Sequence, residues 1–573
     1  MPKDNEEWTI TLGSLNGWGG LCPAYFDNSY PYYGNKNHAS EAIDVDLIDP
    51  NVLSQGPAST DVTNGNEVGA LKDSGCIVAI TRSVVATNVA YGIGKKKLYS
   101  IADTTMSASG TFPHTITGSG VITGCDVCHY KGNLFYSYND SALGGAGVTN
   151  GNIGKCTIST FAFDDTYWTV TASGTALENA VHFMLVAGDD VLYITNGRYV
   201  ATLSGTTAVA TAIDFWEDSI TVALAWNGNR VKVGVNRPNI SGSNFNTSAI
   251  YNWDGYSPSW EGDPIELEGQ IGAMYVKNGV EYVWWKDAIT DGGYNLGYVS
   301  GLRIKVLRRY SGSLPNQAQI GEYDGHIAWL SSGKLVMWGA KDADVEYKMF
   351  QYCQAEYSTT IGAFAAPFGT PLISSSKSAE FTAAVTNIIT SEAHGLLNGN
   401  TVVLGTSSAL PAGLSVDTTY YVVQKTDDTF KLSTSSGGDE VDITGTGTGT
   451  HTWYRHSLSK FSTTSYSVDA RYKTLAFKVS GVDYYSQIDL VMVECEPLSS
   501  GAACDFTLTY NKGATTLALD QFAYSATDAT TRRKIMNRGP DVEDFRLDVS
   551  WANATTQFKI RSIQIKGHYK KDN

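Results

Sequence analysis

Apolar and polar residues alternate over short stretches along most of the chain, and this period of two is typical of β-strands. The clearest example lies in residues 545–551, where polar side chains separate Phe545, Leu547, Val549 and Trp551. Such spacing predicts a half-buried antiparallel strand. The nearest candidate for a helix, residues 526–539, is short and lacks an apolar stripe. The pattern therefore predicts an all-β protein.

Between residues 66 and 370, paired runs of this kind recur around short polar turns. The turns contain residues that tolerate a positive φ, such as Gly132 and Gly228, as tight hairpins require. The expected hairpins lie within residues 89–101, 127–138, 183–203, 222–235, 272–285 and 321–339. Their spacing of roughly 40 to 60 residues is that of β-propeller blades. We expect an irregular propeller of about six or seven blades, with a large array of β-sandwiches as the alternative.

Three further segments flank this region. Residues 1–65 are rich in Tyr, Pro, Gly and Asn without periodicity, which predicts an extended N-terminal arm. Such an arm must pack on its own domain or on a neighbouring chain. Residues 378–456 have the texture of a small, compact β module. Residues 457–573 contain several further strand-like runs, and we expect them to form a C-terminal β-sandwich.

The last strand of the sandwich carries a change of phase. Phe558 and Ile560 share one parity of the alternation, whereas Ile563 and Ile565 share the other. One extra residue in a strand shifts its later side chains to the opposite face. We therefore predict a β-bulge near Arg561 and Ser562.

The charge of the chain bears on its partners. It has 57 acidic and 41 basic side chains and a net charge of −16. Phosphate binding needs clustered Lys and Arg, and the only notable basic runs, in residues 94–99 and 531–538, fit solvated turns or strand ends. Specific nucleic-acid binding is not expected. No stretch approaches the ~20 apolar residues of a membrane span, and no apolar region follows the first charges, so we expect neither membrane insertion nor a secretory signal.

The cysteines do not predict a metal site. The chain has 8 of them, dispersed along its length. Cys125 and Cys128 have the spacing of metal ligands, but no second pair follows at zinc spacing. On a strand their thiols would point to opposite faces. We therefore expect reduced thiols, and neither a metal nor any other cofactor.

A series of short motifs in the small module carries a resemblance. They are His394-Gly395-Leu396, Asn398-Gly399, the run 410–414, the strand-like runs 419–423 and 429–433, and Gly449-Thr450-His451. In this order, over about 75 residues, they resemble a small β module that recurs in tail and other structural proteins of tailed bacteriophages. None of these motifs suggests reactive chemistry. His394 before Gly395 fits a turn residue rather than a ligand.

The order of the segments is similar to that of tail nozzle or hub proteins of short-tailed phages, in which several copies form a ring whose channel passes DNA. The resemblance implies a structural protein of the virion tail, assembled in the bacterial host cytoplasm. Its expected partners are other copies of itself in a ring, neighbouring tail or adaptor proteins, and genomic DNA that passes without specific binding. An acidic chain fits such a conduit.

The motifs of common enzymes are not found. A glycosidase needs two carboxylates that face each other across a sugar, but adjacent pairs such as Asp189–Asp190 diverge or occupy turns. The Gly-Tyr-Val-Ser-Gly run of residues 297–301 is out of register for a nucleophile elbow. We expect no catalytic and no cofactor-binding residues, and predict that the chain is not an enzyme. A glycan-degrading tail enzyme is one alternative.

A receptor-binding tail protein that recognises a host surface glycan is the other alternative. Exposed aromatic rings stack on sugars, and the chain has 13 Trp and 33 Tyr. The candidate glycan-contact residues are Trp253, Trp260, Trp284 and Trp285. In a propeller, aromatic side chains also fill the space between blades, so burial decides between the two roles.

Overall fold

The computed structural model describes residues 6–13, 18, 39–47, 49, 51–62, 77–82, 89–102, 105–106, 112–141, 150–169, 176–237, 247–287, 293–331, 334–339, 349–353, 364–366, 371–416, 418–467, 470–475, 477–478, 484–496, 503–512, 515–525, 534–535, 544–551 and 555–571. These residues form strands, turns and one 3-10 turn at Gln317–Gln319. The prediction of an all-β protein is confirmed. Of the candidate helical segment 526–539, the part that is described is the strand β43 (Lys534–Ile535).

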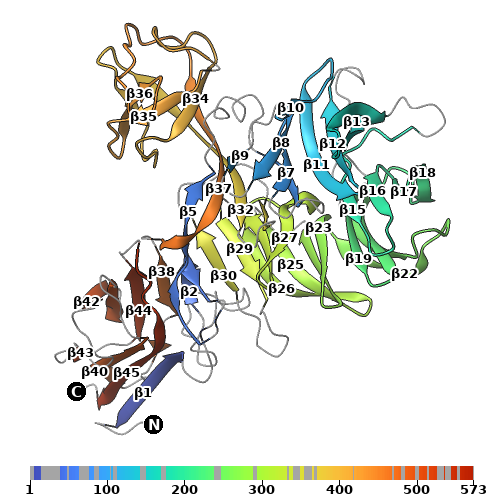
Figure 1. The fold of residues 1–573 in the computed structure, drawn as a ribbon. Coiled ribbons are helices and arrows are strands. Elements are labelled where there is room, and N and C mark those ends of the chain that lie inside the picture. The colour runs from blue at the N-terminus through green and yellow to red at the C-terminus, as the bar shows by residue number, and fades with distance from the viewer. Residues whose placement is uncertain are drawn as a thin grey trace.

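Six blades of a propeller follow one another along the chain (Figure 1). They are β6 (Ala79–Arg82), β7 (Val89–Ile93), β8 (Lys97–Ala102), β9 (Thr105–Met106) and β10 (His114–Thr115); β11 (Ile122–Tyr130), β12 (Asn133–Asp140), β13 (Asn150–Thr157) and β14 (Ala162–Trp168); β15 (Met184–Val186), β16 (Leu192–Asn196), β17 (Tyr199–Ser204) and β18 (Thr207–Asp214); β19 (Ile220–Asn227), β20 (Arg230–Arg237), β21 (Thr247–Trp253) and β22 (Glu261–Glu268); β23 (Gln270–Lys277), β24 (Val280–Lys286), β25 (Gly293–Ser300) and β26 (Arg303–Ser311); and β27 (Ile320–Tyr323), β28 (His326–Ser331), β29 (Lys334–Trp338) and β30 (Met349–Cys353).

A seventh blade closes the ring. It contains β31 (Phe364–Ala365), β32 (Leu372–Ala383), β37 (His451–Tyr466) and β5 (Pro57–Asp61), in that order from the axis outwards. The first strand of each blade contacts the first strand of the next, and β31 contacts both β27 and β6. Within the described residues the propeller therefore has seven blades, the upper value of the predicted range.

The outer strand of the seventh blade comes from the N-terminal segment. β5 pairs with β37, and Ser59 lies opposite Phe461. β5 precedes the first six blades in the sequence, whereas the other strands of this blade follow them. Pairing a strand that precedes the first six blades with one that follows them holds the ring closed and covers an otherwise free edge. The described strands of residues 1–65 thus pack into sheets of the same chain, the first of the two arrangements expected for the N-terminal arm.

The small module is inserted between two strands of the seventh blade. β32 and β37 run antiparallel from Leu372↔Lys460 to Phe381↔His451, and the strands β33 (Ile389–Thr390), β34 (Thr401–Thr406), β35 (Tyr420–Val423) and β36 (Thr429–Ser433) extend their far end. The module has its own core, which includes Leu404, Phe430 and the fully buried Trp453. Figure 1 shows it projecting from the propeller. It therefore interrupts a blade rather than separating the propeller from the sandwich.

Local geometry inside the module agrees with the sequence interpretation. The two strand-like runs are β35 and β36, which pair with each other, with Asp427 and Asp428 in the connecting turn. The backbone N–H of Leu396 donates to His394 Nδ1 over 2.9 Å, and Gly395 has a φ of 60°. His394 is therefore a turn residue whose ring nitrogen satisfies a backbone donor.

A two-sheet sandwich forms the other end of the molecule. One sheet has the order β1 (Glu7–Gly13), β45 (Ile560–Lys571), β40 (Tyr484–Cys495) and β43. The facing sheet has the order β2 (Ala39–Ile43), β38 (Arg471–Thr474), β44 (Asp544–Trp551), β41 (Ala503–Lys512) and β42 (Thr515–Ser525), with β39 (Phe477–Lys478) beside β44. β44 alternates buried and half-buried residues as its sequence predicts. Since β1 and β2 come from the N-terminal segment, residues 457–573 do not form the sandwich alone.

The strand β2 joins the sandwich to the propeller. It pairs with β38 on one side and, in parallel, with β30 on the other, where Ile43 lies opposite Gln351. The propeller blade and the sandwich sheet thereby form one 10-stranded sheet. The short strands β3 (Val45–Asp46) and β4 (Ser54–Gln55) follow, and Leu53 exchanges two backbone hydrogen bonds of 2.8 Å with Ile560. The N-terminal segment is therefore structural in both units.

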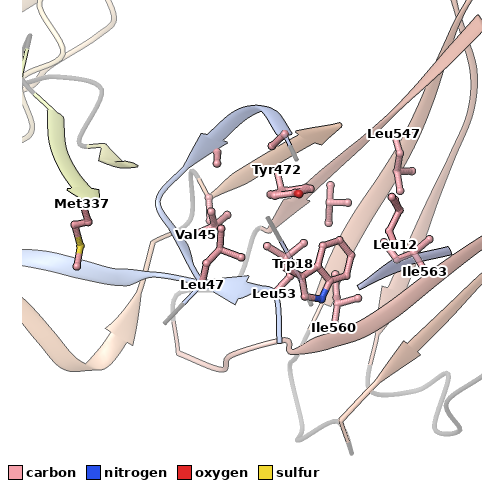
Figure 2. Packing of buried hydrophobic residues seen from close by; sticks show 14 of the residues in the cluster. Leu12, Trp18, Val45, Leu47, Leu53, Met337, Tyr472, Leu547, Ile560 and Ile563 are labelled. Atoms are coloured by element: carbon pink, nitrogen blue, oxygen red, sulfur yellow. The ribbon is translucent and has the colours of Figure 1, made fainter. Parts of the chain in front are cut away.

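The predicted bulge in the last strand is confirmed. Glu494 pairs with Ser562 and Cys495 with Ile560, so Arg561 is the extra residue. Its carbonyl accepts a hydrogen bond of 3.2 Å from the indole N–H of Trp18. Gly13 lies against the same carbonyl with a φ of 72°, and a Cβ there would come within 2.5 Å of it. Figure 2 shows Trp18 in this core beside Leu53, Tyr472 and Ile560.

Candidate functional site

Three of the four candidate glycan-contact residues are buried. Trp253 and Trp284 are 0% exposed and Trp285 is 6% exposed. The indole N–H of Trp253 donates to the carbonyl of Ser257 over 2.7 Å, and the Trp284 ring meets Trp329 edge-on at 5.3 Å. These rings fill the space within and between blades, so a sugar could reach them only after the core repacked.

The fourth candidate, Trp260, lies at the edge of a surface cluster. Its ring is half-buried and stacks on Phe215 at 5.9 Å and 13°. It also meets the buried ring of Tyr251 at 4.8 Å. Next to these rings stands Trp216, which is 56% exposed and donates its indole N–H to the Tyr251 hydroxyl over 2.8 Å.

Arg237 completes this cluster. Its guanidinium lies over the Trp216 ring at 5.5 Å and forms an ion pair of 3.1 Å with Glu266. Burial lowers the pKa of Arg237, but its interactions with Tyr251 and Glu266 together outweigh burial and raise the pKa, so the side chain stays charged. We name Trp216, Arg237, Tyr251, Trp260 and Glu266 the aromatic platform. An exposed ring beside fixed polar groups is the arrangement with which proteins contact sugars.

Sequence reasoning missed Trp216. It lies in the polar turn between β18 and β19, a turn in which Asp218 adopts a φ of 62°. The only sequence cue for its exposure is this setting among acidic turn residues. Its neighbours Arg237 and Glu266 come from other strands of the same blade, and their approach depends on the register of β20, β21 and β22.

A second candidate site is the cavity on the propeller axis. It has a volume of about 480 Å³, and every one of the seven innermost strands contributes to its wall. This volume lies within the range of small-molecule sites, roughly 300–1,000 Å³. Its polar lining includes Arg82, Asp126, Gln317 and Glu322, and Trp226 and Tyr275 supply aromatic surface. A cavity of this size does not admit a DNA duplex.

Asp126 is held tightly in the wall. The register of β11 against β12 shifts between Gly124 and Asp126, so Cys125 is a bulge residue. Bulges re-aim the side chain that follows them. Asp126 accepts hydrogen bonds from the backbone N–H groups of Val127 (2.8 Å) and Met184 (2.7 Å), which ties β11 to β15 of the next blade. Burial raises the pKa of its carboxyl to about 7, although both hydrogen bonds lower it.

The opposite part of the wall carries a partly neutralised carboxylate. Glu322 accepts a hydrogen bond of 3.2 Å from the Tyr275 hydroxyl and lies 3.4 Å from Lys277 Nζ. Gln317 is fully engaged, because its amide exchanges two 3.0 Å hydrogen bonds with the backbone of Met274. Arg82, in contrast, forms no ion pair within the part of the chain that the structure describes.

A third group of titratable residues joins the first two blades. His114 Nε2 lies 2.8 Å from Asp165 Oδ1, and the hydroxyl of Tyr136 donates to the same oxygen. The backbone N–H of Thr117 donates to Asp165 Oδ2 over 2.8 Å, and the His114 ring stacks on Phe163 at 3.7 Å. The strands that carry these residues belong to neighbouring blades, so the cluster fastens one blade to the next.

We expect Asp165→Asn to destabilise the protein by about 2 kcal/mol at neutral pH, since a pKa unit is worth about 1.4 kcal/mol. Burial alone raises the pKa of Asp165, but the bonds from His114, Tyr136 and Thr117 outweigh it and lower the pKa from 3.8 to about 2. A carboxyl group whose pKa is lower in the folded state stabilises the fold fully at pH values above its ordinary pKa. This stabilisation is lost as the pH falls through the folded-state pKa. Urea denaturation between pH 7 and 2 measures this.

The difference in free energy of unfolding between wild type and Asp165→Asn should shrink as the pH falls from about 4 towards 2. A difference that is constant over this range would contradict an ionised, hydrogen-bonded Asp165.

Within the described ranges no group of three or more His, Cys, Asp or Glu residues is placed to hold a metal ion. Among the same residues no helix has the length and hydrophobicity to cross a membrane.

Known proteins resemble this chain in fold alone. No protein-family model and no curated protein matches it. Among solved structures it is similar to an exo-β-1,3-galactanase of Phanerochaete chrysosporium with galactose (9% identity, 86% of this chain and 95% of that one, TM-score 0.28). It is also similar to the β-propeller domain of Myceliophthora thermophila Cps50 (Swd1) (8% identity, 56% and 96%, TM-score 0.34).

A provisionally assigned oxidoreductase (glucose dehydrogenase) of Thermus thermophilus matches as well, at 10% identity over 52% of this chain and 99% of that one, with a TM-score of 0.31. At these identities and scores the matches bear on the all-β propeller architecture alone, and no activity is carried over. They do correct the prediction that the chain is not an enzyme. Enzymes are among the solved structures that match, so the fold gives no ground for excluding catalysis.

Proposed function

We propose that this protein is a structural component of a phage tail, in which several copies form a ring at the nozzle or hub. The observation that carries the proposal is the motif series of residues 394–451, which resembles a module of phage structural proteins. Its insertion within a blade hairpin, with a core of its own, supports the idea of a portable unit that a larger body displays.

The joined architecture suits a part that must keep its shape under load. Strands from the N-terminal segment lie in the sandwich, at the junction and in the seventh blade. The three connections leave few independent hinges between the propeller and the sandwich. In a ring, such a body presents fixed surfaces to other copies and to adjacent tail or adaptor proteins. Any DNA would pass between the copies, because the cavity of a single propeller is only about 480 Å³.

The proposal is tested by electron microscopy of purified virions together with native mass spectrometry of the isolated protein. We expect the chain at the tail, in one fixed copy number with rotational symmetry. Antibody labelling against residues 384–450 locates the module on the same particles. A virion preparation that lacks the chain overturns the proposal.

The aromatic platform favours glycan binding as a second candidate function. A stacked Trp–Arg pair that is exposed on one side offers a ring face and hydrogen-bond donors to a sugar. Neutral oligosaccharides on a glycan array would be the probe. This function is compatible with a place in the tail, but it requires the platform to face outwards.

We expect Trp216→Ala to weaken binding of any glycan held at the platform by about 5- to 30-fold, because a stacking contact is worth ~1–2 kcal/mol. Binding of the array hit is measured by isothermal titration. Leu302→Ala, which removes a 66% exposed apolar side chain from another blade, is the matched control and should bind like the wild type. Equal loss in both variants, or no array hit at all, would reject the platform as a sugar site.

A further inference from the structure

The cavity on the propeller axis contains a charge without an ion-pair partner. Arg82, at the end of the innermost strand β6, lines the cavity, and within the described residues it forms no ion pair. Arg82 is exposed to solvent, so it stays charged without a protein partner, and its guanidinium can bind two carboxylate or phosphate oxygens at once in a fork geometry. The wall does contain two carboxyl groups, and their own contacts explain why neither of them pairs with Arg82.

Both carboxyl groups are already engaged by the protein. Asp126 is 7% exposed, and each of its oxygens accepts a backbone N–H. Burial favours its neutral form. Glu322 is held by the Tyr275 hydroxyl and by Lys277. The charge of Glu322 is therefore matched by Lys277, and the guanidinium of Arg82 remains available to an acidic ligand.

The remaining wall is mixed in character. Trp226 and Tyr275 are half-buried and expose part of their rings to the cavity, which is otherwise lined largely by aliphatic side chains. Carboxyl oxygens of Asp126 and Glu322 keep further lone pairs that can accept from ligand hydroxyl groups. The wall thus offers one guanidinium, hydroxyl acceptors and two aromatic surfaces within about 480 Å³.

We propose that the propeller axis binds a small sugar acid, with its carboxylate on Arg82, its hydroxyl groups on Asp126 and Glu322, and its ring against Trp226 or Tyr275. A volume of this size holds one or two sugar units and excludes a long chain. The site is independent of the platform and of a place in the virion. Its ligand belongs to a different class from the neutral glycans that the platform would contact.

The proposal is tested by titrating the full-length protein with glucuronic acid and with N-acetylneuraminic acid, using glucose as the neutral counterpart. We expect saturable binding of at least one acid and at least about tenfold weaker binding of glucose, since a charge-assisted hydrogen bond contributes roughly 1.5–3 kcal/mol. Saturation-transfer NMR and isothermal titration give the affinities. Equal affinity for acid and glucose, or no saturable binding of either acid, overturns the proposal.

Variants localise the binding. In Arg82→Ala the preference for the acid over glucose should fall by at least about tenfold. Arg303→Ala, at the exposed first residue of β26, makes the same change of charge away from the cavity and should bind like the wild type. Glu322→Gln removes a negative charge from the wall while keeping an acceptor for Tyr275, so it should bind the acid as tightly as the wild type or more tightly. Retained preference in Arg82→Ala overturns the assignment to this cavity.

Discussion

Removal of residues 1–62 is expected to abolish folding of the whole protein. β1 supplies Trp8, Ile10 and Leu12 to the sandwich core, where they are 8%, 2% and 1% exposed. β2 joins the sandwich to the sixth blade, and β5 forms the outer edge of the seventh. Without these strands three sheets have free edges and part of the core is exposed to water. The yield of soluble protein and its far-UV circular dichroism measure the effect.

The matched deletion removes the small module instead. Residues 382–450 are replaced by Asn-Gly, which favours a tight hairpin between the paired residues Phe381 and His451. Phe381 and Trp453 are changed to Thr, since their rings belong to the core of the deleted unit. This variant should stay soluble and unfold cooperatively. A soluble, cooperatively folded 63–573 fragment would contradict the structural role of the N-terminal strands.

Trp18→Ala should lower the free energy of unfolding by about 3–5 kcal/mol, the usual cost of deleting a buried Trp side chain. Trp18 is 0% exposed, and its ring meets Tyr472 edge-on at 5.5 Å (Figure 2). Its indole N–H satisfies the carbonyl at the Arg561 bulge, so the substitution leaves both a cavity and an unpaired acceptor. Urea denaturation followed by circular dichroism measures the loss.

Two comparisons separate these contributions. Trp18→Phe keeps most of the ring but loses the N–H donor, and should cost less than the alanine variant. Trp216→Ala removes the same side chain from a site that is 56% exposed, and should change stability by no more than about 0.5 kcal/mol. Equal destabilisation by Trp18→Ala and Trp216→Ala would show that burial at Trp18 is not what stabilises the sandwich.

Predictions that depended on neighbouring residues were accurate. The hairpin turn at Gly132 has the positive φ of 73° that its composition suggested. Alternation in β44 and the bulge at Arg561 follow from the same side-chain period. Side-chain direction along a strand is a local property, so a few residues of sequence are enough to determine it.

Most features of the candidate sites could not be predicted from neighbouring residues in the sequence. Trp216 lies two residues after β18 and Trp253 is the last residue of β21, yet one is 56% exposed and the other 0%. Their exposure depends on what the adjacent blade places against them. Similarly, Arg82 and Glu322 meet at one cavity only because the ring closes.

The sequence by itself determined the strands, the tight turns, the bulge and the phage-like motif series of the module. Tertiary structure alone decided that β5 closes the seventh blade, that β2 links two units and that the small module projects from within a hairpin. The physical reason is the range of the interactions. Strand and turn geometry is set by neighbours in sequence, whereas edge pairing and burial are set by partners hundreds of residues away, as with Trp18 and Arg561, which are 543 residues apart.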